Sequence, residues 1–287
     1  MSLFIDAKPV FLKGLEKEHN IIACFKKDFE VLENVKTARI NIAARSFYRL
    51  YVNGVLVMHG PARTAHKYLR VDELDIGLHL KKGLNEICIY VISYSDCFNG
   101  YSNDCTLEKG LLMFELTLDD RRIFSDRTVQ GYRMTKRIKA GRISHSRGAG
   151  EIYVLDDDMY EAHEVEELTL DAYLLERGME YPDLFRVDTV RMLEFGSFAY
   201  DEGINVLPEF YEPDYNECYA NLEYRPDQDA KRIVCHPSRG EFHAQKGVYE
   251  INAAEGENPY VLFDFGKSHV GFVTLDLEME SYEEDAF

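Results

Sequence analysis

Hydrophobic and polar residues alternate along Ala38–Ala44, with the two-residue period of a strand that buries one face. The next run, Phe47–Val52, is rich in aromatic and β-branched residues, and Val55–Met58 follows it after two residues. Those two residues are Asn53-Gly54, which favour the positive backbone angles of a type I′ turn. The pattern therefore predicts a β-hairpin, which we interpret as a structural feature without chemistry.

Similar runs recur along the chain and are separated by turn residues. The other predicted strands are Ile21–Val31, Glu86–Tyr94, Leu111–Leu118, Arg121–Phe124, Tyr132–Met134, Val187–Phe195, Asn221–Tyr224, Arg232–Cys235, Val248–Ile251, Tyr260–Phe265 and Val270–Met279. Short strands with little helix between them are typical of antiparallel sandwiches and jelly rolls. We therefore predict a mainly β fold made of two antiparallel β-sandwich domains.

Length and charge divide this pattern into three parts. A chain of 287 residues exceeds the usual size of a single core. Residues 1–140 are predicted to form a jelly-roll β-sandwich. Residues 141–185 are predicted to be a charged linker, because basic residues gather before Gly148 and no Lys or Arg occurs from Gly148 to Glu176. Residues 186–287 begin a second β-sandwich.

Three expectations follow for the linker and the second sandwich. Apolar residues at helical spacing predict a short helix over Ala162–Arg177, ended by Gly178. The second sandwich has room for about half of the residues that such a domain needs, so we expect it to be incomplete and the chain to be a fragment of a longer protein. Unpaired strand edges would then favour a homodimer or a poorly ordered C-terminus.

The charge limits the classes of partner. The chain holds 51 acidic and 33 basic residues, which gives a formal net charge of -18. That charge disfavours nucleic acid and anionic membranes as partners. No apolar run approaches the roughly 20 residues of a membrane-spanning helix, and the N-terminus lacks the features of a signal peptide. We expect a cytoplasmic protein, with a removed signal peptide as the alternative.

The six cysteines also agree with a cytoplasmic protein. None forms a Cys-x-x-Cys pair, and Cys88 lies within a strand-like run, where it is interpreted as a small buried hydrophobic residue. The simplest interpretation is a reduced protein, and a Cys97–Cys105 disulfide is the alternative.

No catalytic motif is present, so we name no catalytic residue and expect no cofactor. Asp156–Asp158 could supply oxygen ligands to Ca²⁺, but three adjacent acids point in different directions and the glycine spacing of a calcium loop is missing. Cys235 and His236 are adjacent on a strand and face opposite sides, which disfavours a shared zinc ion. We therefore expect no metal site.

One loop combines the side chains that carbohydrate recognition uses, namely flat aromatic rings with amide and carboxylate groups. Its candidate carbohydrate-binding residues are Tyr94, Asp96, Phe98, Asn99, Tyr101 and Asn103. A second Tyr-rich stretch contains Tyr211, Tyr215 and Tyr219. The chain has no Trp, so any sugar-stacking site must use Tyr or Phe. The alternative is that these rings only pack on the edge of a sandwich.

Two groups of residues resemble bacterial α-L-rhamnosidases. The first group resembles their N-terminal jelly-roll module, a galactose-binding-like sandwich, and consists of Arg45–Gly54, Gly60-Pro61, Leu74–Ile76 and Lys82–Ile87. Related modules also begin β-galactosidase-like glycosidases. The second group, Val261–Lys267 followed by Gly271–Val273, resembles the opening strands of the second sandwich in the same rhamnosidases. The two groups occur in the order that the family shows.

The resemblance implies a role without catalysis. In that family the sandwiches precede an (α/α)6 barrel that carries the catalytic acids, and no long run of amphipathic helices occurs here. We therefore expect a non-catalytic N-terminal region that packs against the barrel and supports it, and that contacts a rhamnose-containing glycan in one version of the hypothesis. A departure is that Asp126–Val129 lacks the Trp that often follows an Asp in the family. The alternatives are a free-standing carbohydrate-binding module and a ligand-free structural sandwich.

Overall fold

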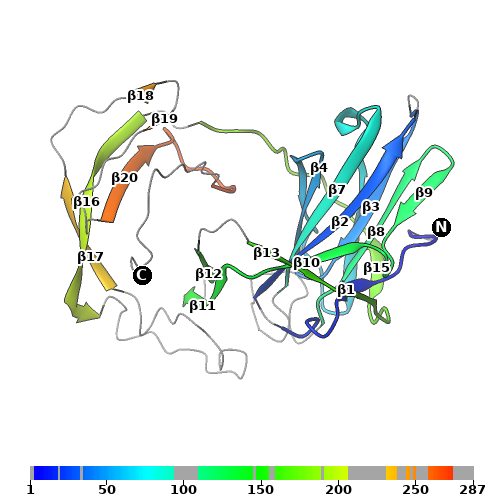
Figure 1. Cartoon of the computed structure of the whole chain (residues 1–287), viewed down its shortest axis with the longest axis horizontal. Helices are drawn as coiled ribbons and strands as arrows, with labels where there is room; N and C mark the ends of the chain where they lie inside the picture. Colours follow the sequence, from blue (N-terminus) through cyan, green and yellow to red (C-terminus); the bar gives the residue numbers. More distant parts are fainter. Residues whose placement is uncertain are drawn as a thin grey trace. The chain divides into compact units, whose positions relative to one another are not determined.

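The structure is a computed structural model in which the chain forms two compact units (Figure 1). The first unit contains the described residues up to Leu184, and the second contains those from Phe185 onward. The structure describes residues 3–18, 20–32, 35–93, 109–144, 147–154, 159–188, 191–205, 231–237, 244–245, 248–249 and 258–273.

The first unit is a sandwich of two sheets. The seven-stranded sheet has the spatial order β14 (Val165–Glu167), β1 (Val10–Leu12), β8 (Leu112–Leu118), β3 (Ala38–Ala44), β6 (Tyr68–Asp75) and β15 (Tyr173–Glu176), with β9 (Arg121–Phe124) also paired to β8. The six-stranded sheet has the order β13 (Tyr160–His163), β10 (Gln130–Met134), β2 (Ile21–Val31), β7 (Gly83–Ser93), β4 (Phe47–Val52) and β5 (Val55–Gly60). Among the described strands of this unit, every pairing is antiparallel except that of β15 with β6, which is parallel. The predicted β-sandwich is therefore confirmed for this unit.

Two smaller elements complete the first unit. A hairpin consists of β11 (Arg137–Ser144) and β12 (Arg147–Tyr153), and a single 3₁₀ turn, η1 (Gly77–His79), follows β6. No α-helix occurs among the residues that the structure describes.

The inward faces of the two sheets share one apolar core. Ile40 and Ile42 of β3 and Ile87 and Ile89 of β7 are fully buried in it. Their neighbours along each strand point to the opposite face of the sheet, as the two-residue period of a strand requires. Burying each such side chain contributes about 1.5–3 kcal/mol relative to exposure, so this alternation determines which face of each strand turns inward.

The predicted hairpin is confirmed as β4 and β5, with positive φ angles of 52° at Asn53 and 78° at Gly54. The strand before it, β3, lies in the opposite sheet, so the chain crosses between the sheets at Arg45-Ser46. Ser46 has a φ of 69°, and the Arg45 guanidinium is buried, where it donates to the Lys109 carbonyl at 2.9 Å. The strand β3 and the hairpin are therefore joined by a crossing between sheets and do not form a continuous meander.

The helix predicted over Ala162–Arg177 is wrong. Its residues form the end of β13, then β14 and β15, which pair with β10, β1 and β6 respectively. The apolar residues that share helical spacing lie in different elements, and Val165 enters the core opposite Leu12. Backbone groups at the open edges of both sheets offer this stretch partners, and that tertiary pairing outweighs local helical spacing.

Residues from the N-terminal and the C-terminal segments of the first unit cover the outer face of the seven-stranded sheet. A second apolar cluster there joins Phe4 near the N-terminus to Leu69 and Val71 of β6, and Leu170 and Leu174 pack against it. Glu115 of β8, which is 5% exposed, accepts backbone N–H groups from residues 5 to 7. The acidic stretch after residue 159 is thus part of the first unit's packing.

The second unit contains a three-stranded sheet of order β17 (Lys231–Pro237), β16 (Arg191–Asn205) and β20 (Asn258–Asp264), and a two-stranded ladder of β18 (Ala244–Gln245) and β19 (Val248–Tyr249). Most of its side chains whose exposure is described are exposed or half-buried. The predicted strand from Val270 is wrong over its first four residues, which have no regular secondary structure. Its remainder and the strand predicted at Asn221–Tyr224 lie outside the described residues.

The edges of this sheet bear on the predicted homodimer. Among the described strands, β17 and β20 each pair with β16 alone. Dimerisation through these edges stays a prediction. No helix in the described part of the chain is long and apolar enough to cross a membrane.

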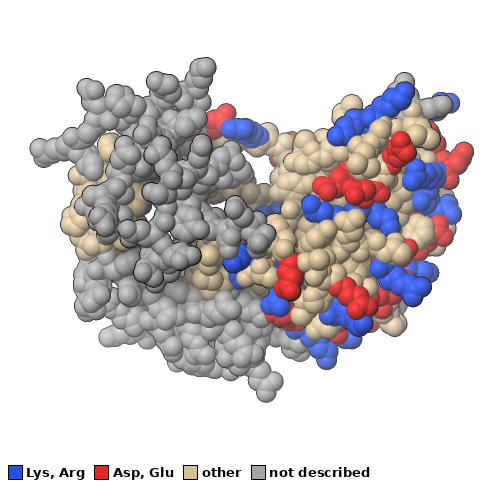
Figure 2. Space-filling view, viewed as in Figure 1, with Lys and Arg blue, Asp and Glu red and all other residues tan. Residues whose placement is uncertain are grey.

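On the first unit, the face in view in Figure 2 shows acidic and basic side chains interspersed rather than separated. The excess of acids is therefore not gathered into one patch on that face.

We predict that Gly60→Ala destabilises the first unit by about 1–3 kcal/mol, the usual cost of overpacking. A Cβ at Gly60 would overlap the Asp72 carboxylate and would lie 2.7 Å from Cε1 of Tyr48. Urea denaturation followed by circular dichroism measures the loss. Gly271→Ala is the matched control, because its Cβ would meet nothing within 4 Å. Equal stability of the two variants would contradict the prediction.

Candidate functional site

The sequence-predicted sugar-binding residues lie outside the described part of the chain. This holds for the loop set Tyr94, Asp96, Phe98, Asn99, Tyr101 and Asn103, for Tyr211, Tyr215 and Tyr219, for Asp156–Asp158, and for Cys97 and Cys105. The ends of the loop are described. It leaves the six-stranded sheet after Ser93 and returns to the seven-stranded sheet through Lys109, whose carbonyl accepts from Arg45. The loop therefore connects a strand of one sheet to a strand of the other.

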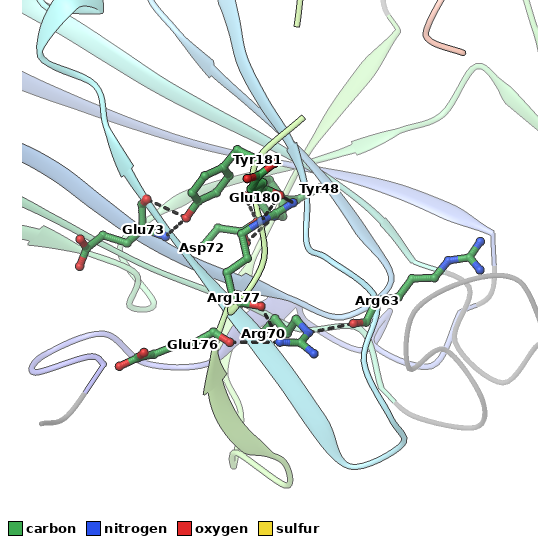
Figure 3. Close-up of polar contacts among 9 residues, drawn as sticks. All are labelled: Tyr48, Arg63, Arg70, Asp72, Glu73, Glu176, Arg177, Glu180 and Tyr181. Carbon is green, nitrogen blue, oxygen red and sulfur yellow. Dashed lines mark hydrogen bonds and ion pairs between the residues drawn. The ribbon is translucent and has the colours of Figure 1, made fainter. Parts of the chain in front are cut away.

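The most buried polar cluster in the first unit is centred on Asp72 of β6, which is 0% exposed (Figure 3). The Tyr48 hydroxyl, from β4 in the other sheet, donates to Oδ2 of Asp72 at 2.5 Å. Nη1 of Arg177 donates to Oδ1 at 2.8 Å. Both carboxylate oxygens thus have a charged or hydroxyl partner, and the Tyr48 contact links the two sheets through the core.

A second layer of contacts holds Arg177 in place (Figure 3). Its guanidinium lies 4.4 Å from the centroid of the Tyr181 ring, and its Nε and Nη2 donate to the Glu180 carbonyl. The Tyr181 hydroxyl donates to the Glu73 carbonyl at 2.8 Å. The segment after β15 is therefore fixed onto β6 by side-chain contacts that follow the parallel strand pairing.

Arg70 of β6 extends the same attachment. Its Nη1 donates to the Arg177 carbonyl at 2.5 Å and to the Glu176 carbonyl at 3.3 Å, while its Nε donates to the Arg63 carbonyl at 2.8 Å. One arginine thus binds the backbone carbonyl groups of Glu176, the last residue of β15, and of Arg177, which follows it.

The electrostatics of this cluster favour a structural role over a catalytic one. Burial, followed by the neighbouring Asp72 carboxylate, raises the pKa of Tyr48, so its hydroxyl keeps its proton and acts as a donor. Burial also raises the pKa of Tyr181. A carboxylate that is 0% exposed and has both oxygens engaged is not presented to a substrate. We therefore assign the Tyr48–Asp72–Arg177 cluster to holding the sandwich closed.

The outer face of the six-stranded sheet is the second feature of interest, because it carries partly exposed aromatic rings. Cross-strand pairing places one row of side chains on this face, namely Ala162, Tyr132, Cys24, Tyr90, Arg49 and His59. The residues before and after Cys24, Ala23 and Phe25, belong to the core, which places this row on the opposite face.

Aromatic contacts run along this face. Tyr90 lies between Tyr51, with ring centroids 5.4 Å apart, and Tyr160, at 6.1 Å. At the far edge His59 stacks on Phe47 at 5.5 Å. Burial and the neighbouring Arg49 lower the pKa of His59, which keeps the imidazole neutral at pH 7. Such rings offer stacking surfaces either to a sugar or to another protein surface.

Sequence reasoning missed both features. Tyr48 had a partial signal, since it occupies an alternating position of a predicted strand. Nothing local marks Asp72 and Arg177 as partners of each other. Their sequence separation of 105 residues is bridged only by the tertiary fold. No group of three or more potential metal-ligating side chains occurs among the described residues.

Comparison with known proteins gives matches of structure only. No model of a protein family matches the chain, and no curated protein matches its sequence. A GH78 family rhamnosidase of Bacillus sp. GL1 is similar with a TM-score of 0.58 and 23% identity, over 69% of this chain and 22% of that chain.

Two further solved structures share the name rhamnosidase. An α-L-rhamnosidase from Aspergillus terreus has a TM-score of 0.42 and 19% identity, over 57% of this chain and 21% of that chain. One from Dictyoglomus thermophilum has a TM-score of 0.43 and 17% identity, over 67% of this chain and 26% of that chain. This chain thus spans about a quarter or less of the length of the three proteins.

The Bacillus structure shows that the described sandwich shares its fold with part of a rhamnosidase. The resemblance to α-L-rhamnosidases that the sequence predicts is therefore confirmed at the level of the fold.

We predict that Arg177→Met lowers the free energy of unfolding of the first unit by about 3–5 kcal/mol, because the buried Asp72 carboxylate loses its ionic partner. Arg39→Met is the matched control, since its pair with Glu73 is 60% exposed on both sides and is worth at most about 1 kcal/mol. Urea denaturation monitors both variants.

The double variant Asp72→Asn/Arg177→Met tests the same cause. It should recover part of the loss, because this cluster then holds no buried charge without a partner. An Arg177→Met variant as stable as Arg39→Met would contradict the assigned role.

Proposed function

We propose that this chain is the non-catalytic sandwich region of a rhamnosidase-like glycoside hydrolase, in which it packs against and supports a catalytic (α/α)6 barrel. The observation that carries the proposal is the fold likeness to the Bacillus rhamnosidase, which extends over 69% of this chain and 22% of that protein. A region of that proportion leaves most of such an enzyme to other domains.

The internal contacts of the chain are consistent with a structural role beside a catalytic domain. The buried charged groups Asp72, Arg177 and Glu115 all have structural partners within the sandwich. In the second unit, most described residues are exposed or half-buried, including Leu193 and Leu262, which are both 50% exposed. Contact with a further domain would remove such apolar side chains from water.

The second candidate function is carbohydrate binding by the first unit. The aromatic rings on the outer face of the six-stranded sheet favour it, together with the loop that contains Tyr101. Both features combine flat rings with polar groups, which is the chemistry of a sugar site. The partner in this case would be a rhamnose-containing glycan.

We predict that the 287-residue chain alone shows no turnover of an aryl α-L-rhamnoside above a heat-denatured sample, because no catalytic residue can be assigned to it. We also expect the open reading frame that encodes it to continue for several hundred helix-rich residues. Product release by the purified chain would refute the non-catalytic role, and a reading frame that stops after Phe287 would refute the barrel partner.

For the second function, we predict that binding to rhamnose-containing glycans on an array weakens about tenfold in Tyr101→Ala or Tyr160→Ala, since one stacking contact is worth up to about 1.5 kcal/mol. A loss in Tyr101→Ala alone would place the sugar at the loop, and a loss in Tyr160→Ala alone would place it on the sheet. Tyr173→Ala is the control, because this exposed tyrosine lies on the other sheet. An array without signal for the unmodified chain would exclude this function.

A further inference from the structure

Two cysteines from neighbouring strands meet on the outer face of the six-stranded sheet. Cys24 of β2 lies opposite Tyr90, and Cys88 of β7 lies opposite Lys26, so the two thiols are diagonal neighbours on one face. Their sulfur atoms are 3.2 Å apart, and the residues are 1% and 5% exposed. The sequence showed only one buried hydrophobic position at Cys88 and gave no sign of this pair.

The groups around the sulfur atoms favour one thiolate shared with one thiol. Hydrogen bonding from Cys24 lowers the pKa of Cys88, and the same contact raises the pKa of Cys24. Burial acts against this and raises the pKa of Cys88, as does the Glu86 carboxylate, whereas the Tyr90 hydroxyl and the Lys26 ammonium lower it. Lys26 is held nearby by its ion pair with Glu86 at 3.5 Å. Positive charge and a hydrogen-bond donor are the conditions under which a cysteine becomes nucleophilic.

We propose that Cys24 and Cys88 form a dithiol exchange site, which reacts with low-molecular-weight disulfides such as glutathione disulfide and closes a reversible disulfide between β2 and β7. The Cys88 thiolate attacks one sulfur of the small disulfide, forms a mixed disulfide and releases the first small thiolate, which takes up a proton. Cys24 then loses its proton, attacks the Cys88 sulfur and releases the second small thiol. Two protein thiols are oxidised and one small disulfide is reduced to two thiols.

The distance between the two sulfur atoms is compatible with this chemistry. A disulfide needs a sulfur–sulfur distance of about 2.05 Å, so the atoms must approach by only about 1 Å. Diagonal neighbours in antiparallel strands lie slightly farther apart than an ideal disulfide allows, which favours a bond that forms and is reduced again rather than a permanent link.

Closure would tie together the two longest strands of the six-stranded sheet. β2 and β7 are paired along all 11 residues of each, and the bond would join positions 64 residues apart in the chain. A cross-link of that span restricts the unfolded chain, so the oxidised first unit should melt several degrees higher than the reduced one. This inference is independent of the proposed function, because it needs neither a glycan nor a barrel.

Peptide mapping of the unmodified chain tests the proposal. After incubation with glutathione disulfide under native conditions, we expect a cross-linked pair of peptides that contains Cys24 and Cys88, with a mass about 2 Da below the sum of the free peptides. Cleavage after Tyr90 separates Cys88 from Cys97 and Cys105 in the sequence. Dithiothreitol should release the peptides, and scanning calorimetry should show the higher melting temperature before reduction only.

Single variants test the order of the two steps. In Cys24→Ser we expect a stable glutathione adduct on Cys88, and in Cys88→Ser we expect Cys24 to remain largely unmodified. Cys235→Ser is the control, because this exposed cysteine lies in the second unit and should not affect closure. Lys26→Gln keeps both thiols and should slow closure several-fold, which keeps the test valid where a cysteine variant fails to fold.

The proposal is overturned where Cys235 becomes glutathionylated while Cys24 and Cys88 stay reduced over the same period. It is also overturned where Cys24→Ser and the unmodified chain give the same products, since the pair would then have no joint chemistry.

Discussion

The sandwich depends on one buried carboxylate, Asp72, which connects three separate parts of the chain. Its partners come from the opposite sheet through Tyr48 and from the segment after β15 through Arg177. Removing a charge from water costs several kcal/mol unless its partners are complete, so the cluster is stable only when all three parts are in place. Gly60 belongs to the same constraint, because its missing side chain leaves the space that the Tyr48–Asp72 pair occupies.

The fold could be predicted from the sequence where the signal was local. β2, β3, β4 and β9 begin and end at the predicted residues, because each has a strong β pattern bounded by turn residues. The acidic stretch after residue 159 could not be predicted in this way. Its helical spacing was real, but its backbone groups are taken up by β1, β10 and β6, and those partners are set by the tertiary fold.

The site was less predictable than the fold, for a related reason. A buried polar cluster is defined by which distant residues meet, and Asp72 lies in a segment whose local sequence has no feature of a site. The pair of Cys24 and Cys88 shows the same limit, because strand register alone brings the two thiols together.

Because β1 pairs with β14, the seven-stranded sheet cannot be completed until β14 has been synthesised. Strand Val10–Leu12 leaves the ribosome early, yet its partner is Val165–Glu167, and Asp72 must likewise wait for Arg177. Contacts of such long range close slowly and carry a large loop entropy. A nascent chain that has emerged only as far as β10 therefore exposes two incomplete sheets, and it is in this interval that aggregation or a chaperone competes with folding.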